Sequence, residues 1–404
     1  MKKIQERAGR PDVMKLLADA RPEALDPALL ADAPRQRTDL ARILAGGTEG
    51  QGRLRVVRPF WAGMVRPLGA AVALTAVAAT VVVVSSADSQ TPSGGAGTRS
   101  QASSGDPAVP GGRLELLAAA KKAETSPAEG TYWQTATRSD SVDVVGKEGA
   151  LFAVNTTSKA EWSVGVRPGT QSLMVTGIDG ATAPRTAADK ARWQAAGSPA
   201  SLQAPGGEGA GKGTLEIVIG SQGRPLVMET NSDEKIYSLG PRNVSYDDLR
   251  ELPSKSDELS AYLKALYAED SGAETASGQT AWMLRRAADL VTMPVKPAVR
   301  AAAYRVMADL PGVRVLARAT DPLGREGVAV VAPGTVRTLL GSVEQRLVVD
   351  PSTGEMLCEQ DILVEPSARA EEAGLKAGTT VNYQATTGMS WGEQQITVPA
   401  NAQR

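Results

Sequence analysis

Residues 68–84 read LGAAVALTAVAATVVVV, a run with no charged side chain in which only two threonines are polar. As a helix, this run would be about 25 Å long at about 1.5 Å per residue, close to the thickness of the hydrocarbon core of a bilayer. It is apolar on every side, whereas a helix of a soluble core usually has a polar face, and it is too long for one strand. Together with the small residues that follow it, the run predicts a transmembrane helix over residues 68–87.

The charges on either side of this run predict its orientation in the membrane. Four arginines precede it with no acidic residue among them: Arg53, Arg55, Arg58 and Arg66. The first charge after it is Asp88. Since Lys and Arg stay on the cytoplasmic side, we expect residues 1–67 in the cytoplasm and the C-terminal domain outside the cell membrane. A cleaved signal peptide is the alternative, because Ser85 and Ala87 suit a small-x-small cleavage site, although residues 1–67 are far longer than an ordinary n-region.

The composition excludes most catalytic and metal sites. The chain of 404 residues has a formal net charge of −1, no histidine and one cysteine, Cys358. The lack of histidine excludes the usual Ser and Cys triads and nearly all ordinary zinc sites, and one cysteine cannot form an intrachain disulfide. We therefore assign no catalytic, cofactor-binding or metal-binding residue and no cofactor, and we predict a protein that is not an enzyme. Cys358 is expected in the core, on the strand face shared by Met356 and Ile362, since free cysteine is usually buried.

The segments that flank the apolar run differ in character. Residues 1–67 carry an excess of Lys and Arg over Asp and Glu, and they contain three short helical patterns that are too short to be stable alone in water. They form either an idle tail or a segment that docks a cytoplasmic protein partner. We expect no direct binding of nucleic acid, because anionic lipid accounts for basic residues next to a membrane. Residues 88–112 are rich in Gly, Ser and Pro, which predicts a flexible linker.

Residues 113–404 have the pattern of one extracytoplasmic α+β domain, in which strands are followed by helices and then by strands again. The first strands are expected over residues 132–138, 150–156, 161–166, 172–177 and 213–219. In the helical block, an apolar stripe that includes Leu284 and Val291 predicts a helix whose charged residues face away from the core. Those charged residues are Arg285, Arg286 and Asp289. Asp247, Asp248, Asp257 and Glu258 lie near expected helix starts, where acids compensate the helix dipole.

The last part of the domain predicts two hairpins and a final strand. The turn sequences DPLG at residues 321–324 and DPSTG at residues 350–354 each separate two apolar runs, and the final strand is expected over residues 379–386. Because hairpins build antiparallel sheet, we predict one large curved antiparallel sheet with helices covering one face. An incompletely filled concave side of such a sheet is a place where an apolar envelope ligand binds.

Several segments of the chain together resemble a known group of proteins. In order, they are LLADARPEALDPALL, TDLARILAG, TYWQTATR, KARWQAAGSPA, VSYDDLRELPSKSDELSAYL, AAAYRVMADLPGVRVL, DPLGREGVAV and RLVVDPSTGEML. The chain resembles a family of uncharacterised actinomycete single-span membrane proteins that are often encoded beside extracytoplasmic-function sigma factors. The resemblance implies an anti-sigma-like or envelope-sensing role, without the His-x-x-x-Cys-x-x-Cys zinc motif of many anti-sigma factors. The outer half also looks loosely like lipoprotein-carrier folds and the sensor domains built on them.

Two functions remain open from the sequence. In the first, the protein is a signalling or interaction protein, with an outer domain that senses or binds an envelope component and a tail that docks a partner such as a sigma factor. In the second, it is a membrane-anchored carrier or binding module for an apolar envelope ligand, and the tail serves only topology. The sequence identifies neither the ligand nor the partner.

Overall fold

The computed structural model describes residues 112–403 apart from residues 168, 206–213, 232–234 and 271–277. The tail, the transmembrane helix and nearly all of the linker that the sequence predicts lie outside these residues. Among the residues that are described, no helix is long and apolar enough to cross a bilayer.

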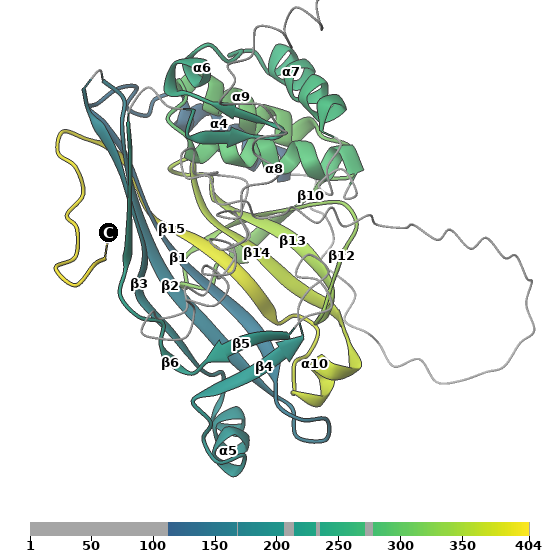
Figure 1. Cartoon of the computed structure of the whole chain (residues 1–404). Helices are drawn as coiled ribbons and strands as arrows, with labels where there is room; N and C mark the ends of the chain where they lie inside the picture. The colour runs from purple at the N-terminus through teal and green to yellow at the C-terminus, as the bar shows by residue number, and fades with distance from the viewer. Residues whose placement is uncertain (1–111, 168, 206–213, 232–234, 271–277, 404) are drawn as a thin grey trace, which may run out of the picture. The chain divides into compact units, whose positions relative to one another are not determined.

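A single antiparallel sheet of eleven strands forms the frame of the domain, and it curves around one face (Figure 1). Its strands run in the order β10-β11-β13-β14-β15-β1-β2-β3-β6, with β12 paired to β13 and β7 paired to β3. The bounds are β1 (Tyr132–Val145), β2 (Phe152–Gly165), β3 (Gln171–Pro184), β6 (Gly220–Ser221), β7 (Leu226–Asn231), β10 (Arg314–Thr320), β11 (Glu326–Val331), β12 (Val336–Thr338), β13 (Gly341–Asp350), β14 (Glu355–Pro366) and β15 (Thr380–Gly392). The described region is therefore an α+β fold with a large antiparallel sheet, as predicted.

The first three strands are longer than the sequence indicates. The prediction of two separate strands over residues 150–156 and 161–166 is wrong, because both belong to β2, which pairs with β1 along its whole length. The polar residues around Lys159 interrupt the apolar pattern at mid-strand, and Lys159 itself is exposed and pairs with Asp179 at 2.7 Å. A surface ion pair of this kind needs no break in the backbone, so the strand continues through it.

Five helices cover one end of the concave face, which we call the inner face (Figure 1). They are α4 (Gly112–Ala123), α6 (Tyr246–Arg250), α7 (Ser256–Glu269), α8 (Gly278–Thr292) and α9 (Pro297–Asp309). Their apolar sides form the largest core cluster with Trp133 of β1, Val164 of β2 and Val330 of β11. The predicted helix start near Asp247 and Asp248 is confirmed, because the hydroxyl of Ser245 accepts a hydrogen bond from the backbone N–H of Asp248 at 3.1 Å and caps α6.

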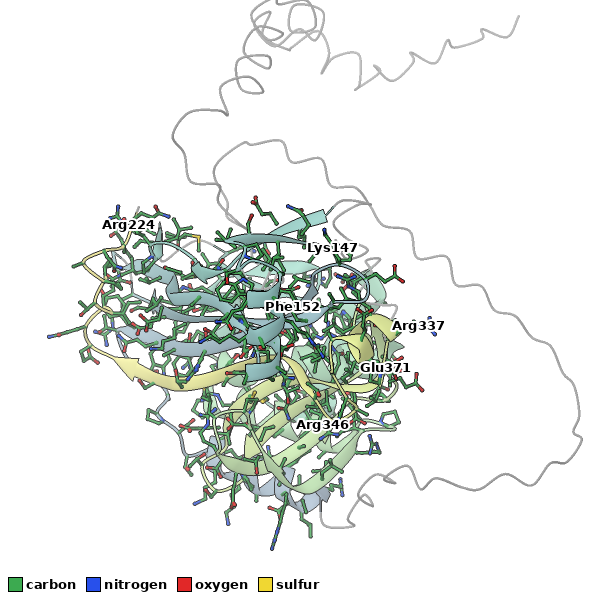
Figure 2. The ribbon with its side chains drawn as sticks, turned by 90° about the horizontal axis from the view of Figure 1, so that it is seen from below. Lys147, Phe152, Arg224, Arg337, Arg346 and Glu371 are labelled. Carbon is green, nitrogen blue, oxygen red and sulfur yellow. The ribbon has the colours of Figure 1, made fainter. Side chains whose placement is uncertain are left out.

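A hairpin covers the opposite end of the inner face. It consists of β4 (Ser201–Pro205) and β5 (Thr214–Val218), and α5 (Ala187–Ala195) lies beside it. Ile217 and Ala204 of the hairpin pack on Val145, Phe152 and Val154 of the sheet. In the view from below, Phe152 lies near the middle of the domain, between Arg224 at one side and Arg337 at the other (Figure 2).

The convex face, which we call the outer face, is covered by three other segments. These are α10 (Ala368–Glu372), the turn at residues 321–325 and the C-terminal residues 393–403. The single cysteine lies under the turn, where Cys358 packs with Val348, Tyr383 and Leu323.

Cys358 is buried, as predicted, but its predicted strand face is wrong. In the pairing of β13 with β14, Val348 lies opposite Cys358 and Val349 lies opposite Met356, so β14 contains one extra residue, Leu357. This β-bulge reverses the alternation of side chains. Cys358 consequently faces outward, whereas Met356 packs in the core under the helices. Burial raises the pKa of the Cys358 thiol far above its ordinary value.

Candidate functional site

A row of polar residues crosses the inner face over six adjacent strands. Each residue of this row lies directly opposite the next in the strand register: Gln345 (β13), Asp361 (β14), Asn382 (β15), Ser141 (β1), Thr156 (β2) and Thr182 (β3). Directly opposed residues of antiparallel strands point to the same side of the sheet. We call this set the polar row, and its side chains therefore share the inner face.

A second line of polar residues runs next to the polar row, two residues nearer to the helices. It consists of Glu359 (β14), Gln384 (β15), Ser139 (β1) and Ser158 (β2), again in direct register. Both lines lie between the apolar cluster under the helices and the apolar cluster under the β4–β5 hairpin. Several of these side chains, among them Ser139, Asn382 and Gln384, are only half-buried. The middle of the inner face is thus a polar floor between two apolar covers.

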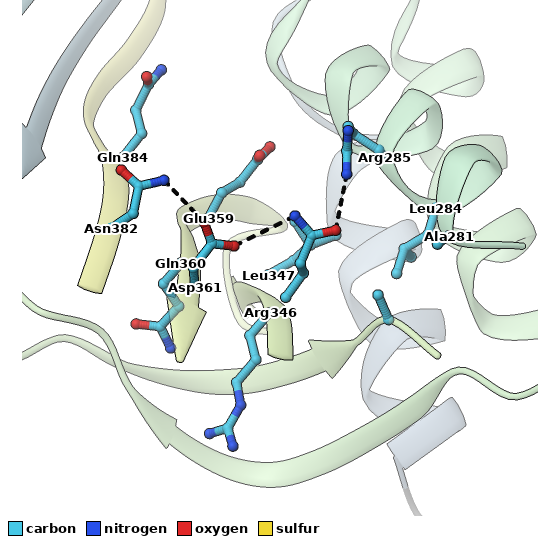
Figure 3. A pocket seen from close by; sticks show the side chains of 12 residues that line it. Ala281, Leu284, Arg285, Arg346, Leu347, Glu359, Gln360, Asp361, Asn382 and Gln384 are labelled. Atoms are coloured by element: carbon cyan, nitrogen blue, oxygen red, sulfur yellow. Dashed lines mark hydrogen bonds between the residues drawn. The ribbon is translucent and has the colours of Figure 1, made fainter. Parts of the chain in front are cut away.

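Hydrogen bonds connect the members of the polar row at both ends. At the end of the row formed by β13, β14 and β15, which we call the helix end because α8 lies next to it, Arg285 of α8 donates to Gln345 at 2.9 Å, and Asn382 donates to Asp361 at 3.1 Å (Figure 3). Gln345 also donates to the other oxygen of Asp361, at 3.4 Å. At the far end, the hydroxyls of Thr156 and Thr182 are 2.8 Å apart, and Gln222 donates to Thr182 at 2.7 Å. These bonds hold the polar side chains in fixed positions.

A pocket opens where the polar row meets α8. Its cavity of about 30 Å³ is lined by Ala281, Leu284 and Arg285 of α8 and by residues of β13, β14 and β15. One water molecule needs a cavity of roughly 10–15 Å³, so this cavity has room for about two non-hydrogen atoms. Glu359 and Gln384 point into the space between β15 and α8 (Figure 3).

Two of the three charged residues of α8 next to this pocket, Arg286 and Asp289, are buried. The prediction that all three face away from the core is therefore wrong for these two. Arg286 and Asp289 are each 4% exposed and form an ion pair at 3.2 Å. The guanidinium of Arg286 also lies 5.7 Å from the ring centre of Trp282. Helix α8 packs against the sheet on one side and against α9 on another. A prediction from one apolar stripe assumes that only one side of the helix is buried, so it assigns Arg286 and Asp289 to the surface.

Glu359 is the most perturbed carboxyl group near the pocket. Burial raises the pKa of Glu359 to about 8, and the nearby carboxylates of Asp289 and Asp361 act in the same direction, while Arg285 and Arg286 oppose them. Burial also raises the pKa of Asp361, and its hydrogen bonds from Asn382 and Gln345 reduce that effect. A carboxyl group shifted in this way is a common feature of binding and catalytic sites.

We predict that Glu359→Gln makes the protein more stable at alkaline pH. In the unfolded chain Glu359 loses its proton near pH 4.5, whereas in the folded domain it keeps the proton until about pH 8, so wild-type stability falls as pH rises between these values. The neutral amide avoids this loss, and since one pKa unit corresponds to about 1.4 kcal/mol, we expect a gain of several kcal/mol in the free energy of unfolding at about pH 9. Urea unfolding of wild type and Glu359→Gln between pH 4.5 and about pH 9 measures the difference in free energy of unfolding. Glu355→Gln, an exposed change on the same strand, is the control. A parallel pH dependence of wild type and Glu359→Gln would contradict the prediction.

The acids that the sequence places near helix starts do not join this site. Asp248 accepts a hydrogen bond from the backbone N–H of Ser245 at 2.9 Å, and Asp257 and Glu258 lie in the first turn of α7. The sequence does not predict any residue of the pocket as part of a site. A local signal exists only in β15, where Asn382 and Gln384 alternate with Val381, Tyr383 and Ala385. In β14, Gln360 stands between Glu359 and Asp361, so that segment shows no alternation.

Comparison with known proteins yields no match to a family model, to a curated protein or to a solved structure. The resemblance to the actinomycete single-span family therefore stays a prediction, and the function has to be argued from the inner face.

Proposed function

We propose that this chain is a single-pass membrane protein whose domain of residues 113–404 binds a polar ligand outside the cell. The observation that carries the binding function is the polar row, together with the pocket at its helix end. An antiparallel sheet that is covered on a face normally presents apolar side chains there. Between the two covers of the inner face, amides, hydroxyls and carboxyls instead lie in register across six strands, and those of Thr156, Thr182 and Asp361 are buried.

The membrane layout and the tail complete this proposal. The uncharged run at residues 68–84 and the arginines before it support a span with residues 1–67 in the cytoplasm. The helical patterns of residues 1–67 support a docking segment for a protein partner, for which a sigma factor is the candidate that the family resemblance implies. Binding of the ligand outside and of the partner inside would make the protein a sensor rather than an enzyme.

The alternative, a carrier for an apolar envelope ligand, receives less support from the inner face. The pocket next to α8 is small, and its lining includes Glu359, Asp361 and Arg285. Asp361 and Arg285 already have hydrogen-bond partners in the domain, but a hydrocarbon chain would leave the buried Oε1 atom of Glu359 without one among the described residues, at a cost of about 1–3 kcal/mol. A polar ligand that supplies donors and acceptors fits these side chains better.

One purification tests both halves of the proposal. We expect full-length protein, purified in detergent from its own source cells, to carry a polar small molecule and a cytoplasmic protein, both identified by mass spectrometry. Asn382→Leu combined with Ser141→Val removes hydrogen-bonding groups from the polar row and should lose the small molecule while keeping the protein partner. A variant with residues 1–67 in scrambled order should show the opposite pattern.

Three results would count against this proposal. Lipid recovered in place of a polar molecule would favour the apolar carrier. Equal amounts of the small molecule from wild type and from the polar-row variant would place its site elsewhere on the protein. Recovery of the same proteins with the native and with the scrambled tail would remove the docking function.

A further inference from the structure

The pocket beside α8 contains a buried carboxyl oxygen with no partner in the described part of the chain. Glu359 is 8% exposed, and its Oε1 atom accepts no hydrogen bond from any described residue. A buried polar atom without a hydrogen-bond partner destabilises the folded domain, and a charged one does so more strongly. A donor that enters the pocket would therefore bind Glu359 Oε1 with a gain that a solvent-exposed carboxylate cannot provide.

Charged groups of both signs face Glu359 from α8 and from its own strand. On α8 they are Arg285, Arg286 and Asp289, and on its own strand Asp361. Arg286 and Asp289 pair with each other, while on β13 Arg346 pairs with Glu344 at 2.7 Å. The neighbours contributed by β15 are the neutral amides of Asn382 and Gln384. Glu344 also pairs with Arg314, so the groups named here carry no net charge when all are ionised. The two carboxylates of β14 nevertheless repel each other, and a positively charged donor beside Glu359 Oε1 offsets this repulsion.

The size of the cavity limits what that positive group can be. About two non-hydrogen atoms fit, which corresponds to an ammonium nitrogen and the first carbon of its chain. A planar guanidinium has four non-hydrogen atoms before its chain begins and needs more space than an ammonium group. Within the described ranges, no group of three or more His, Cys, Asp or Glu side chains is arranged to hold a metal ion. A primary ammonium group is small, carries one charge and offers three donors.

We infer that this pocket binds the primary ammonium group of an alkylamine ligand, with Glu359 as its counter-ion and with the remainder of the ligand along the polar row. The inference rests on the proposed ligand-binding function and names the chemical class of the group that binds at the helix end of the row.

Methylammonium chloride is the probe that fits the cavity, and thermal unfolding of the full-length protein in detergent is the measurement. At about pH 9 an alkylammonium group keeps its proton, as lysine does with a pKa of about 10.4. We expect the melting temperature to rise with methylammonium concentration, relative to sodium chloride at equal ionic strength. Glu359→Gln should abolish the rise, and Glu355→Gln, an exposed change on the same strand, should keep it. Tetramethylammonium, which is larger and has no N–H donor, should have no effect.

The pH dependence of methylammonium binding tests whether ionised Glu359 is the counter-ion. Since Glu359 must lose a proton with a pKa of about 8 before it can act as counter-ion, the apparent affinity should be roughly 100-fold weaker at about pH 6 than at about pH 9. Methylammonium keeps its proton at both pH values, so tighter binding at the lower pH would mean that ionised Glu359 is not its counter-ion, and it would overturn the inference. No stabilisation of the wild type at either pH, or equal stabilisation of Glu359→Gln, would overturn it too.

A crystal structure with methylammonium excludes the simplest competing explanation. Electron density for ordered water alone beside Glu359 would show that solvent satisfies this carboxyl group, and the inference would then fail. Failure of the inference is distinguishable from failure of the proposed function. A polar molecule that co-purifies with the wild type but not with the polar-row variant would still support the proposed function.

Discussion

Replacement of Asp321 by alanine is expected to lower the free energy of unfolding by about 3–4 kcal/mol, because it removes a fully buried carboxylate that pairs with the half-buried Arg325 and accepts two backbone hydrogen bonds. The side chain of Asp321 is fully buried, and its Oδ2 atom accepts hydrogen bonds from Arg325 Nε at 2.8 Å and Nη2 at 2.6 Å. Its Oδ1 atom accepts from the backbone N–H groups of Leu323 at 2.9 Å and Arg325 at 2.8 Å. The carboxylate therefore closes the turn between β10 and β11 and pairs with the arginine.

Arg325 in turn fixes this hairpin to the sheet. Its guanidinium donates to the backbone carbonyls of Thr386 on β15 at 2.6 Å and Leu357 on β14 at 2.7 Å. Without Asp321 this positive charge would remain partly buried with no counter-ion, and Leu323 would lose its fixed position over Cys358. Breaking a buried pair from one side is costlier than replacing the whole pair by apolar residues.

Two measurements test the prediction for Asp321→Ala. Chemical unfolding gives the free energy, and Glu326→Ala, an exposed change in the same hairpin, should stay within about 0.5 kcal/mol of the wild type. Because Cys358 is the only cysteine, the rate of its reaction with iodoacetamide reports opening of the turn, and the rate should increase in Asp321→Ala. Unchanged stability together with an unchanged reaction rate would show that the pair does not hold the turn.

Replacement of Arg300 by methionine is expected to cost a similar amount, about 3–4 kcal/mol, because two helix-end carbonyls lose a charged donor. Arg300 is 3% exposed and donates to the carbonyls of Val291 at 2.8 Å and Met293 at 3.1 Å, where α8 ends. It also donates to Ser126 at 3.0 Å, and its guanidinium lies 5.1 Å from the ring centre of Trp133. One side chain thus joins α9, the end of α8, the segment after α4 and strand β1.

Methionine preserves most of the apolar volume of Arg300, so the expected loss reflects the missing donors rather than a cavity. Burial lowers the pKa of Arg300 to about 10, which shows that the charge itself is held at some cost. Arg300→Lys should recover only part of the stability, because an ammonium group cannot reproduce the fork of a guanidinium. Arg305→Met on the same helix is the matched control, since Arg305 makes a surface pair with Glu124 that is worth no more than about 1 kcal/mol. Equal losses for Arg300→Met and Arg305→Met would contradict this explanation.

Much of the fold follows from local signals in the sequence. The turn sequences at residues 321–324 and 350–354 predict both C-terminal hairpins, and Pro297 predicts the start of α9. These signals act over a few residues and depend little on the rest of the chain. In the second turn, for example, the carboxylate of Asp350 accepts from the backbone N–H of Ser352 at 2.8 Å, and Gly354 has a φ of 77°.

The polar row has no comparable local signal, because it depends on strand register. Asp361, Ser141 and Thr182 come from distant parts of the chain, and only the pairing of β14, β15, β1, β2 and β3 aligns them. The face on which Cys358 lies depends on a bulge, which shifts the alternation by one residue and leaves no mark in the sequence. Burial of Arg286 and Asp289 likewise depends on what encloses α8, not on the periodicity of α8 itself.

The place of β15 in the sheet has a consequence for how the chain is made. This strand is the last in the sequence, yet it lies between β14 and β1 and joins the two halves of the sheet. While a ribosome is still adding residues 380–392, β1 and β14 each present an edge with unpaired backbone groups, and such edges attract strands of other copies. The complete sheet can therefore form only after β15 has left the ribosome, and a protein truncated before residue 380 should aggregate rather than form half of the sheet.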